Sequence, residues 1–240
     1  MGIVVSATKV VTVNDAHQNG VDTSVEANPT FGRLKGIRLV HVYSRNQKGD
    51  RRDDGNPLMH ALKARRGFTI APFWVQQLMT RARQILEKVK EDLQGFDHCL
   101  PIPSSSPFCA QFAALVSDIS GAPLLDPSFL RKRQVGELLA DARAAPPRMR
   151  PGLRGAFASQ LHAWDQMEPT AVYQAKDIDV GLRPFFGAFT LGGDPPELHG
   201  KRVLIVDDLF ASGSSLLSVR EILQNQLGAE VAGVCFLSGV

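Results

Sequence analysis

The sequence predicts an α/β fold in which helices cover both faces of a mainly parallel sheet. Short apolar runs rich in strand-forming residues occur near 97–102, 122–126, 202–207 and 231–237. Helical patterns lie between several of these runs, for example at 109–120, where Gly121 marks the helix end. Strands that alternate with helices at this spacing form βαβ units, whose strands run parallel.

The composition is that of a globular protein without a membrane span. The 240 residues are 44% hydrophobic and 21% charged, with a formal net charge of +3, which excludes a disordered or collagen-like chain. No apolar run reaches the ~18 residues of a membrane helix, and the N-terminus lacks the pattern of a secretory signal. Three cysteines without CxxC spacing predict reduced thiols in a cytoplasmic protein.

The chain divides into two predicted parts, an N-terminal β/α arm or hood at 1–95 and a core domain at 96–240. Residues 36–45 form a predicted strand. A helix is predicted from Pro72 to the stop at Gly95, because apolar residues recur every three or four positions. Residues 126–183 show little pattern, and their Ala, Pro, Arg and Gly content is typical of a functional loop or an insertion.

The strongest motif is the strand at 202–207 and the residues that follow it. Asp207 and Asp208 end the apolar run, and a loop of small residues comes next: Ala211, Ser212, Gly213, Ser214 and Ser215. A turn after Asp207 is expected to rotate Asp208 back, so that both carboxylates reach the ligand. Ligands of open α/β sheets bind at the carboxyl ends of the strands. Bare N–H groups in a loop that opens a helix bind anions. Carboxylates beside an anion site fit a ribose 5-phosphate, whose hydroxyl groups donate to the acids while its phosphate binds the loop.

This segment resembles the phosphoribosyl pyrophosphate (PRPP) signature of the type I phosphoribosyltransferases, which have a Rossmann-type fold. Two positions depart from the family pattern: Phe210 is bulkier than usual, and Ala211 stands where a hydroxyl residue is common. A strand that ends in two acids also occurs in phosphorylated receiver domains. Receivers need acids from several strands and a later lysine, so the Ser/Gly loop directly after Asp208 disfavours that alternative.

Two further segments extend the resemblance, which covers roughly residues 96–240. Ser104, Ser105 and Ser106 follow a strand that ends in Pro-Ile-Pro, as in the pyrophosphate loop of the ComF-like branch, and residues 182–191 resemble a second ComF-like strand. The resemblance implies that Arg131 and Lys132 lie in a mobile loop that contacts pyrophosphate. An ordinary serine turn and a solvated basic turn are the alternatives, and the zinc-binding cysteines of ComF are absent.

The resemblance implies transfer of the phosphoribosyl group from PRPP to a base or amine acceptor with release of pyrophosphate. Asp207 and Asp208 would be the catalytic carboxylates, and they would contact Mg²⁺ through Mg-PRPP. The acceptor's contacts are expected from 1–95 or 140–180, and the resemblance leaves a homodimer open.

Residues 33–66 hold ten basic and three acidic residues, a net charge of +7 that exceeds the +3 of the whole chain. Such asymmetry is typical of a protein with a polyanionic partner, although a solvated loop and helix face have the same composition. An alternative function follows, in which a phosphoribosyltransferase fold acts as a regulator or toxin-like effector in a nucleic-acid or protein assembly. Nucleic acid that stays bound during purification would favour this alternative.

Overall fold

A computed structural model describes residues 1–46, 56–179, 181–210 and 212–238. Its centre is a six-stranded sheet that contains β5 (Ile37–Arg45), β11 (Glu230–Leu237), β10 (Arg202–Leu209) and β7 (His98–Pro101), in that order and all parallel. The short strands β3 (Val21–Asp22) and β4 (Thr30–Leu34) pair antiparallel with β5. The predicted α/β class with a mainly parallel sheet is therefore confirmed.

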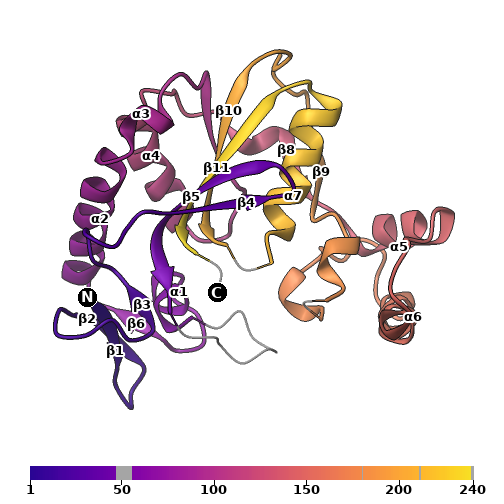
Figure 1. Cartoon of the computed structure of the whole chain (residues 1–240). Helices are drawn as coiled ribbons and strands as arrows, with labels where there is room; N and C mark the ends of the chain where they lie inside the picture. The colour runs from indigo at the N-terminus through magenta and orange to yellow at the C-terminus, as the bar shows by residue number, and fades with distance from the viewer. Residues whose placement is uncertain (47–55, 180, 211, 239–240) are drawn as a thin grey trace.

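Helices cover both faces of this sheet, because alternate residues of β10 pack into two separate cores. Leu204 and Val206 join one core with α1 (Pro57–Leu62), α2 (Pro72–Glu87), α3 (Lys90–Leu93) and α4 (Phe108–Ser120). Val203 and Ile205 join the other core with α5 (Val135–Ala144), α6 (Pro151–Asp165) and α7 (Ser214–Glu221). Figure 1 shows α2, α3 and α4 on one side of the sheet and α7 on the other.

The N-terminal part supplies strands to the central sheet as well as a small sheet of its own. The small sheet contains β1 (Gly2–Val5), β2 (Val10–Asn14) and β6 (Thr69–Ile70). Both β4 and β5 belong to the sheet that also holds β10. The predicted division between 1–95 and 96–240 therefore does not coincide with a boundary between sheets.

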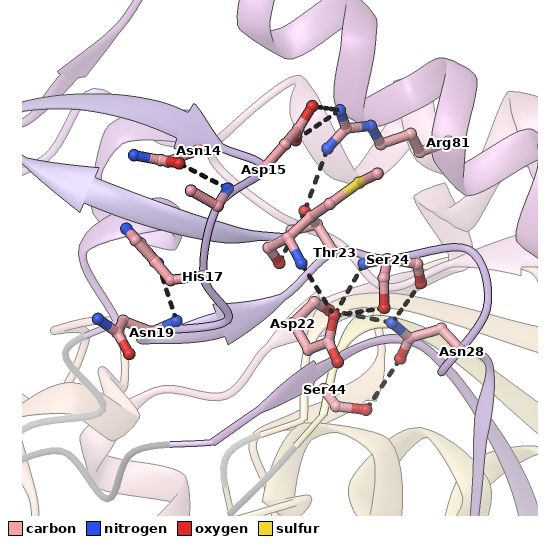
Figure 2. Close-up of polar contacts among 12 residues, drawn as sticks. Asn14, Asp15, His17, Asn19, Asp22, Thr23, Ser24, Asn28, Ser44 and Arg81 are labelled. Carbon is pink, nitrogen blue, oxygen red and sulfur yellow. Dashed lines mark hydrogen bonds and ion pairs between the residues drawn. The ribbon is translucent and has the colours of Figure 1, made fainter.

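A polar network fastens the N-terminal segment to the sheet and to α2 (Figure 2). Asp22 accepts hydrogen bonds from the backbone N–H and the hydroxyl of Ser24, at 2.9 and 2.6 Å. The Asn28 amide donates to the carbonyl oxygens of Asp22 and Ser24. Arg81 of α2 pairs with Asp15 at 2.9 Å. These contacts fix the start of the chain against the helix layer.

The predicted helix from Pro72 to Gly95 is two helices in the structure. Pro72 opens α2 as expected, but α2 ends at Glu87 and α3 follows. Val89 has φ −123°, outside helical geometry. The Lys88 ammonium at this break donates to three backbone carbonyls between positions 25 and 28, at 2.5 to 3.4 Å. The break thus provides a second anchor for the N-terminal segment.

The prediction of a strand at 122–126 is wrong. Only an isolated parallel bridge forms there, between Leu124 and Cys99 of β7. The backbone bonds from Cys99 N to Pro123 O and from Leu125 N to Cys99 O are present, at 2.8 and 2.9 Å. Pro123 has no N–H to continue a ladder. A 3₁₀ segment, η1 (Pro127–Phe129), follows, with Asp126 as its N-cap.

The segment 126–183, expected as a loop or insertion, forms mostly helix. Helices α5 and α6 lie at the edge of the molecule (Figure 1), and Trp164 is buried in the core on their side. Strand β8 (Leu130–Lys132) pairs antiparallel with β9 (Phe189–Leu191). Short turns η2 (Ala175–Asp177) and η3 (Arg183–Phe185) connect α6 to β9, and a π-helical turn, η4 (Ile222–Gln226), extends α7.

Within the described ranges, no helix combines the length and the hydropathy that a membrane crossing requires.

Candidate functional site

A cleft of about 670 Å³ opens at the carboxyl ends of β7 and β10. Its walls come from five places: the end of β10 with the loop before α7, the serines after β7, the end of α1 with the turn after it, Lys132 at the end of β8 (Leu130–Lys132), and the segment from Gln174 to β9. Parallel strands bring their carboxyl ends to one edge of the sheet, which is where ligands of open α/β folds bind. The cleft therefore gathers segments that lie far apart in the sequence.

The acidic pair lies inside strand β10. We expected a turn directly after Asp207 that would rotate Asp208 towards it, but the strand continues to Leu209. The prediction of a turn is therefore wrong, because Leu209 still pairs with Leu237 of β11. Both acids nevertheless line the cleft. The Asp207 side chain folds back, and its Oδ1 accepts a hydrogen bond from the Asp208 N–H at 2.8 Å.

Asp208 is only 3% exposed and is bound to a lysine from the N-terminal part. The Lys63 ammonium donates to Oδ1 of Asp208 at 2.6 Å. The other carboxylate oxygen, Oδ2, is buried and accepts no hydrogen bond from the described residues. A buried carboxylate oxygen without a donor is costly, and a hydrogen-bond donor that reached Oδ2 would remove that cost.

The environment of Asp207 disfavours the charged form of its carboxyl group. Burial, and then the nearby charge of Asp208, raise the pKa of the Asp207 carboxyl, and Lys63 acts in the opposite direction. Positive charge or hydrogen-bond donors supplied by a ligand would therefore be stabilised strongly here.

The loop before α7 depends on a glycine at the start of the helix. Gly213 caps α7 with φ +70°, a left-handed conformation that glycine adopts without strain. A Cβ atom at this position would lie 2.6 Å from Leu34 and 2.8 Å from Phe210. Four residues of the predicted phosphate loop line the cleft, namely Ser212, Gly213, Ser214 and Ser215. Ala211, the first residue of that loop, lies outside the described residues.

Two of the three predicted pyrophosphate serines line the cleft. Ser104 and Ser105 are exposed there. Ser106 is buried, does not line the cleft, and accepts a hydrogen bond from the N–H of Phe108 at 3.4 Å. Its hydroxyl thus helps to begin α4.

Arg131 and Lys132 point in different directions, because neighbouring residues of a strand alternate faces. Lys132 lines the cleft, whereas Arg131 does not. Arg131 makes two hydrogen bonds to the Glu137 carboxylate, at 2.8 and 2.6 Å. This partner holds the pKa of Glu137 at about 2.

Several lining residues were not predicted as site residues. Lys63, Arg65 and Arg66 belong to the basic stretch 33–66, which had suggested a polyanionic partner rather than this cleft. In the same stretch, the basic residues 48, 51 and 52 and the acids 50, 53 and 54 lie outside the described residues. Gln174 and Asp177 also line the cleft, in a stretch where the sequence shows no motif, and Arg183 lies in the ComF-like stretch 182–191 but was not predicted as a site residue.

Residues 165–239 match the family model described as "Phosphoribosyl transferase domain". This stretch includes β9, β10 with its acidic pair, the loop before α7, and β11. No curated protein matches the chain. Among solved structures, the chain is similar to the adenine phosphoribosyltransferase of Leishmania tarentolae, with 11% identity and a TM-score of 0.38 over 99% of this chain and 94% of that one. The segment that carries the acidic pair and the glycine loop is thus similar to phosphoribosyltransferase domains.

Proposed function

We propose that the protein binds PRPP and transfers its phosphoribosyl group to a base or amine acceptor, releasing pyrophosphate. The observation that carries this proposal is the unit formed by β10, its acidic pair and the loop at 212–215, which opens into one cleft with Ser104, Ser105 and Lys132. The family match over 165–239 covers this unit. The ComF-like motifs at 97–106 and 182–191 support that branch of the family, which stays a prediction.

In the proposed reaction, the acceptor nitrogen forms a bond to the anomeric carbon of PRPP while the bond from that carbon to pyrophosphate breaks. The ribose carbon gains positive charge in the transition state, and the carboxylates of Asp207 and Asp208 stabilise it electrostatically. The same two side chains accept hydrogen bonds from ribose hydroxyl groups. The N–H groups of the loop at 212–215 bind the 5-phosphate, while Ser104, Ser105 and Lys132 face the pyrophosphate.

The two carboxylates fit Mg²⁺, which prefers oxygen ligands. Oxygen atoms of Asp207 and Asp208 and the sulfur of Cys109 lie within 4.8 Å of one another. The Cys109 sulfur does not suit Mg²⁺, because this hard cation prefers oxygen ligands. Asp207 and Asp208 would contact Mg²⁺ bound to PRPP, which would neutralise charge on the pyrophosphate.

We place the acceptor beside the segment 174–177. Gln174 and Asp177 line the cleft, and the two side chains offer donors and acceptors to a base or amine. This location falls within the part of the chain, 140–180, from which acceptor contacts are expected.

The second candidate, a regulator or effector with a nucleic-acid or protein partner, is favoured by the hairpin of β4 and β5. Arg33 and Arg38 form a cross-strand pair on it, and both are exposed, as is Lys35. Arg38 also pairs with Asp92 at 3.8 Å, and a polyanion would contact Arg33 and Lys35 on the same hairpin. Purification with and without nuclease, followed by the absorbance ratio at 260 and 280 nm, tests this candidate.

Calorimetry with PRPP and Mg²⁺, followed by a screen of bases and amines for pyrophosphate release, tests the transferase proposal. Saturable PRPP binding and release of pyrophosphate with one acceptor class are expected. A protein that does not bind PRPP is not a phosphoribosyltransferase. Binding without turnover for any acceptor would favour the regulator.

A further inference from the structure

We propose that the turn after α1, residues 63–67, is an anion-binding element that contacts the pyrophosphate group of the ligand. This inference rests on the proposed function and deepens it. We call this segment the cationic turn, because it carries Lys63, Arg65 and Arg66, all three of which line the cleft. The sequence motifs assign pyrophosphate only to the serine loop and to residues 131–132.

A direct contact joins the cationic turn to the serine loop. The Nη2 group of Arg65 donates to Oγ of Ser105 at 3.1 Å, although the two residues are 40 positions apart. Arginine presents several donors in a planar fork. One of these donors contacts Ser105. A ligand bound to the serine hydroxyls would therefore lie close enough to accept hydrogen bonds from the other N–H groups of Arg65. An oxygen-rich anion satisfies both.

The backbone of the turn is held in an unusual conformation. Ala64 and Arg66 have φ values of 49° and 55°, which non-glycine residues rarely adopt. The N–H of Arg65 donates to the carbonyl of His60 at 2.8 Å, and the Lys9 ammonium donates to the carbonyl of Arg66 at 3.0 Å. Such conformations persist where the surroundings fix them, and they are frequent at functional sites.

The ion pairs of the cationic turn leave the Arg65 guanidinium available to a ligand. Lys63 is already paired with Asp208. In the part of the chain that the structure describes, Arg65 makes no ion pair with a carboxylate, and its side chain is exposed. Among the described residues that line the cleft, five are cationic and three are acidic. This excess positive charge matches a strongly anionic ligand.

The position of the turn favours pyrophosphate over the 5-phosphate. Arg65 contacts the serine loop, which follows β7, whereas the loop at 212–215 follows β10. Two separate anion sites at the ends of neighbouring strands suit a ligand with phosphate groups at both ends. Inorganic pyrophosphate and ribose 5-phosphate therefore probe the two sites separately.

The test uses calorimetric titration of the full chain with pyrophosphate in the presence of Mg²⁺, and separately with ribose 5-phosphate. The Arg65→Met variant removes the charge and keeps the length of the side chain. The Arg65→Lys variant keeps the charge but loses the planar fork. The Arg83→Met variant is the matched control, because Arg83 is an exposed arginine on α2, where it pairs with Asp118 at 2.7 Å, and it does not line the cleft.

Arg65→Met is expected to weaken pyrophosphate binding about tenfold or more, the loss of one charge-assisted hydrogen bond, and to leave ribose 5-phosphate binding unchanged. Arg65→Lys is expected to lie between Arg65→Met and the unsubstituted protein, and Arg83→Met is expected to bind both ligands normally. Normal pyrophosphate binding by Arg65→Met, or an equal loss of both ligands, would overturn the inference. If the unsubstituted protein binds neither ligand, the proposed function itself fails.

Discussion

Replacing Gly213 with alanine is expected to abolish tight PRPP binding and to destabilise the fold. The φ of +70° costs a residue with a Cβ about 1–2 kcal/mol. The new Cβ would also lie 2.6 Å from Leu34 and 2.8 Å from Phe210, and overpacking of this kind costs about 1–3 kcal/mol. The free energy of unfolding should therefore fall by about 2–5 kcal/mol. Where the Leu34 and Phe210 side chains do not move aside, the loop shifts and carries its N–H groups away from the phosphate.

The Gly121→Ala variant separates strain from the steric clash. Gly121 has φ +76°, but a Cβ there meets no atom within 4 Å, and the residue lies at the end of α4, away from the cleft. Urea unfolding should show a loss of about 1–2 kcal/mol for Gly121→Ala, with normal PRPP affinity by calorimetry. Equal losses of stability in the two variants, together with normal PRPP affinity in Gly213→Ala, would refute both the clash and the role of the loop.

Three further predictions concern the core and the periphery. The buried Tyr43 hydroxyl donates to the carbonyl of Leu78 at 2.6 Å, so Tyr43→Phe should lower the unfolding free energy by about 1 kcal/mol in urea denaturation; an unchanged midpoint would contradict this. All three cysteines are buried, and burial raises the pKa of Cys99 to about 12, so a thiol reagent should label the protein only after denaturation. Because Arg131 lowers the pKa of Glu137 to about 2, their interaction stabilises the native protein above the unfolded pKa and is lost as the pH falls towards 2. Glu137→Gln should therefore lose less stability than the unsubstituted protein between pH 5 and pH 2, and identical acid profiles would count against the pair.

The features that were predictable from sequence are those that neighbouring residues determine. The apolar run before Asp207 forms a central strand, and Gly213 begins a helix as its position after the acids suggested. Gly121 ends α4 in the left-handed conformation that favours glycine. In each case, local propensity and the tertiary environment agree.

The features that were missed depend on contacts between distant parts of the chain. Lys63 and Asp208 are 145 positions apart, and no local pattern indicates that their side chains meet. The basic composition of 33–66 was visible, but whether Arg65 faces solvent or the cleft depends on how α1 packs on the sheet. The turn expected after Asp207 failed for a similar reason, since pairing with β11 extends β10 to Leu209.

Calorimetric titration of Mg-PRPP into the protein and into its Asp207→Asn, Asp208→Asn double variant tests whether the two carboxylates bind the ribose of PRPP. The double variant keeps the shape of both side chains and removes their charges. Each charge-assisted hydrogen bond to a ribose hydroxyl group contributes roughly 1.5–3 kcal/mol, so two losses correspond to at least about a hundredfold weaker binding. We expect saturable PRPP binding by the unsubstituted protein, and a loss of this size in a double variant whose circular dichroism spectrum is unchanged. A double variant that binds PRPP as tightly as the unsubstituted protein would contradict the assignment of these carboxylates as ribose ligands.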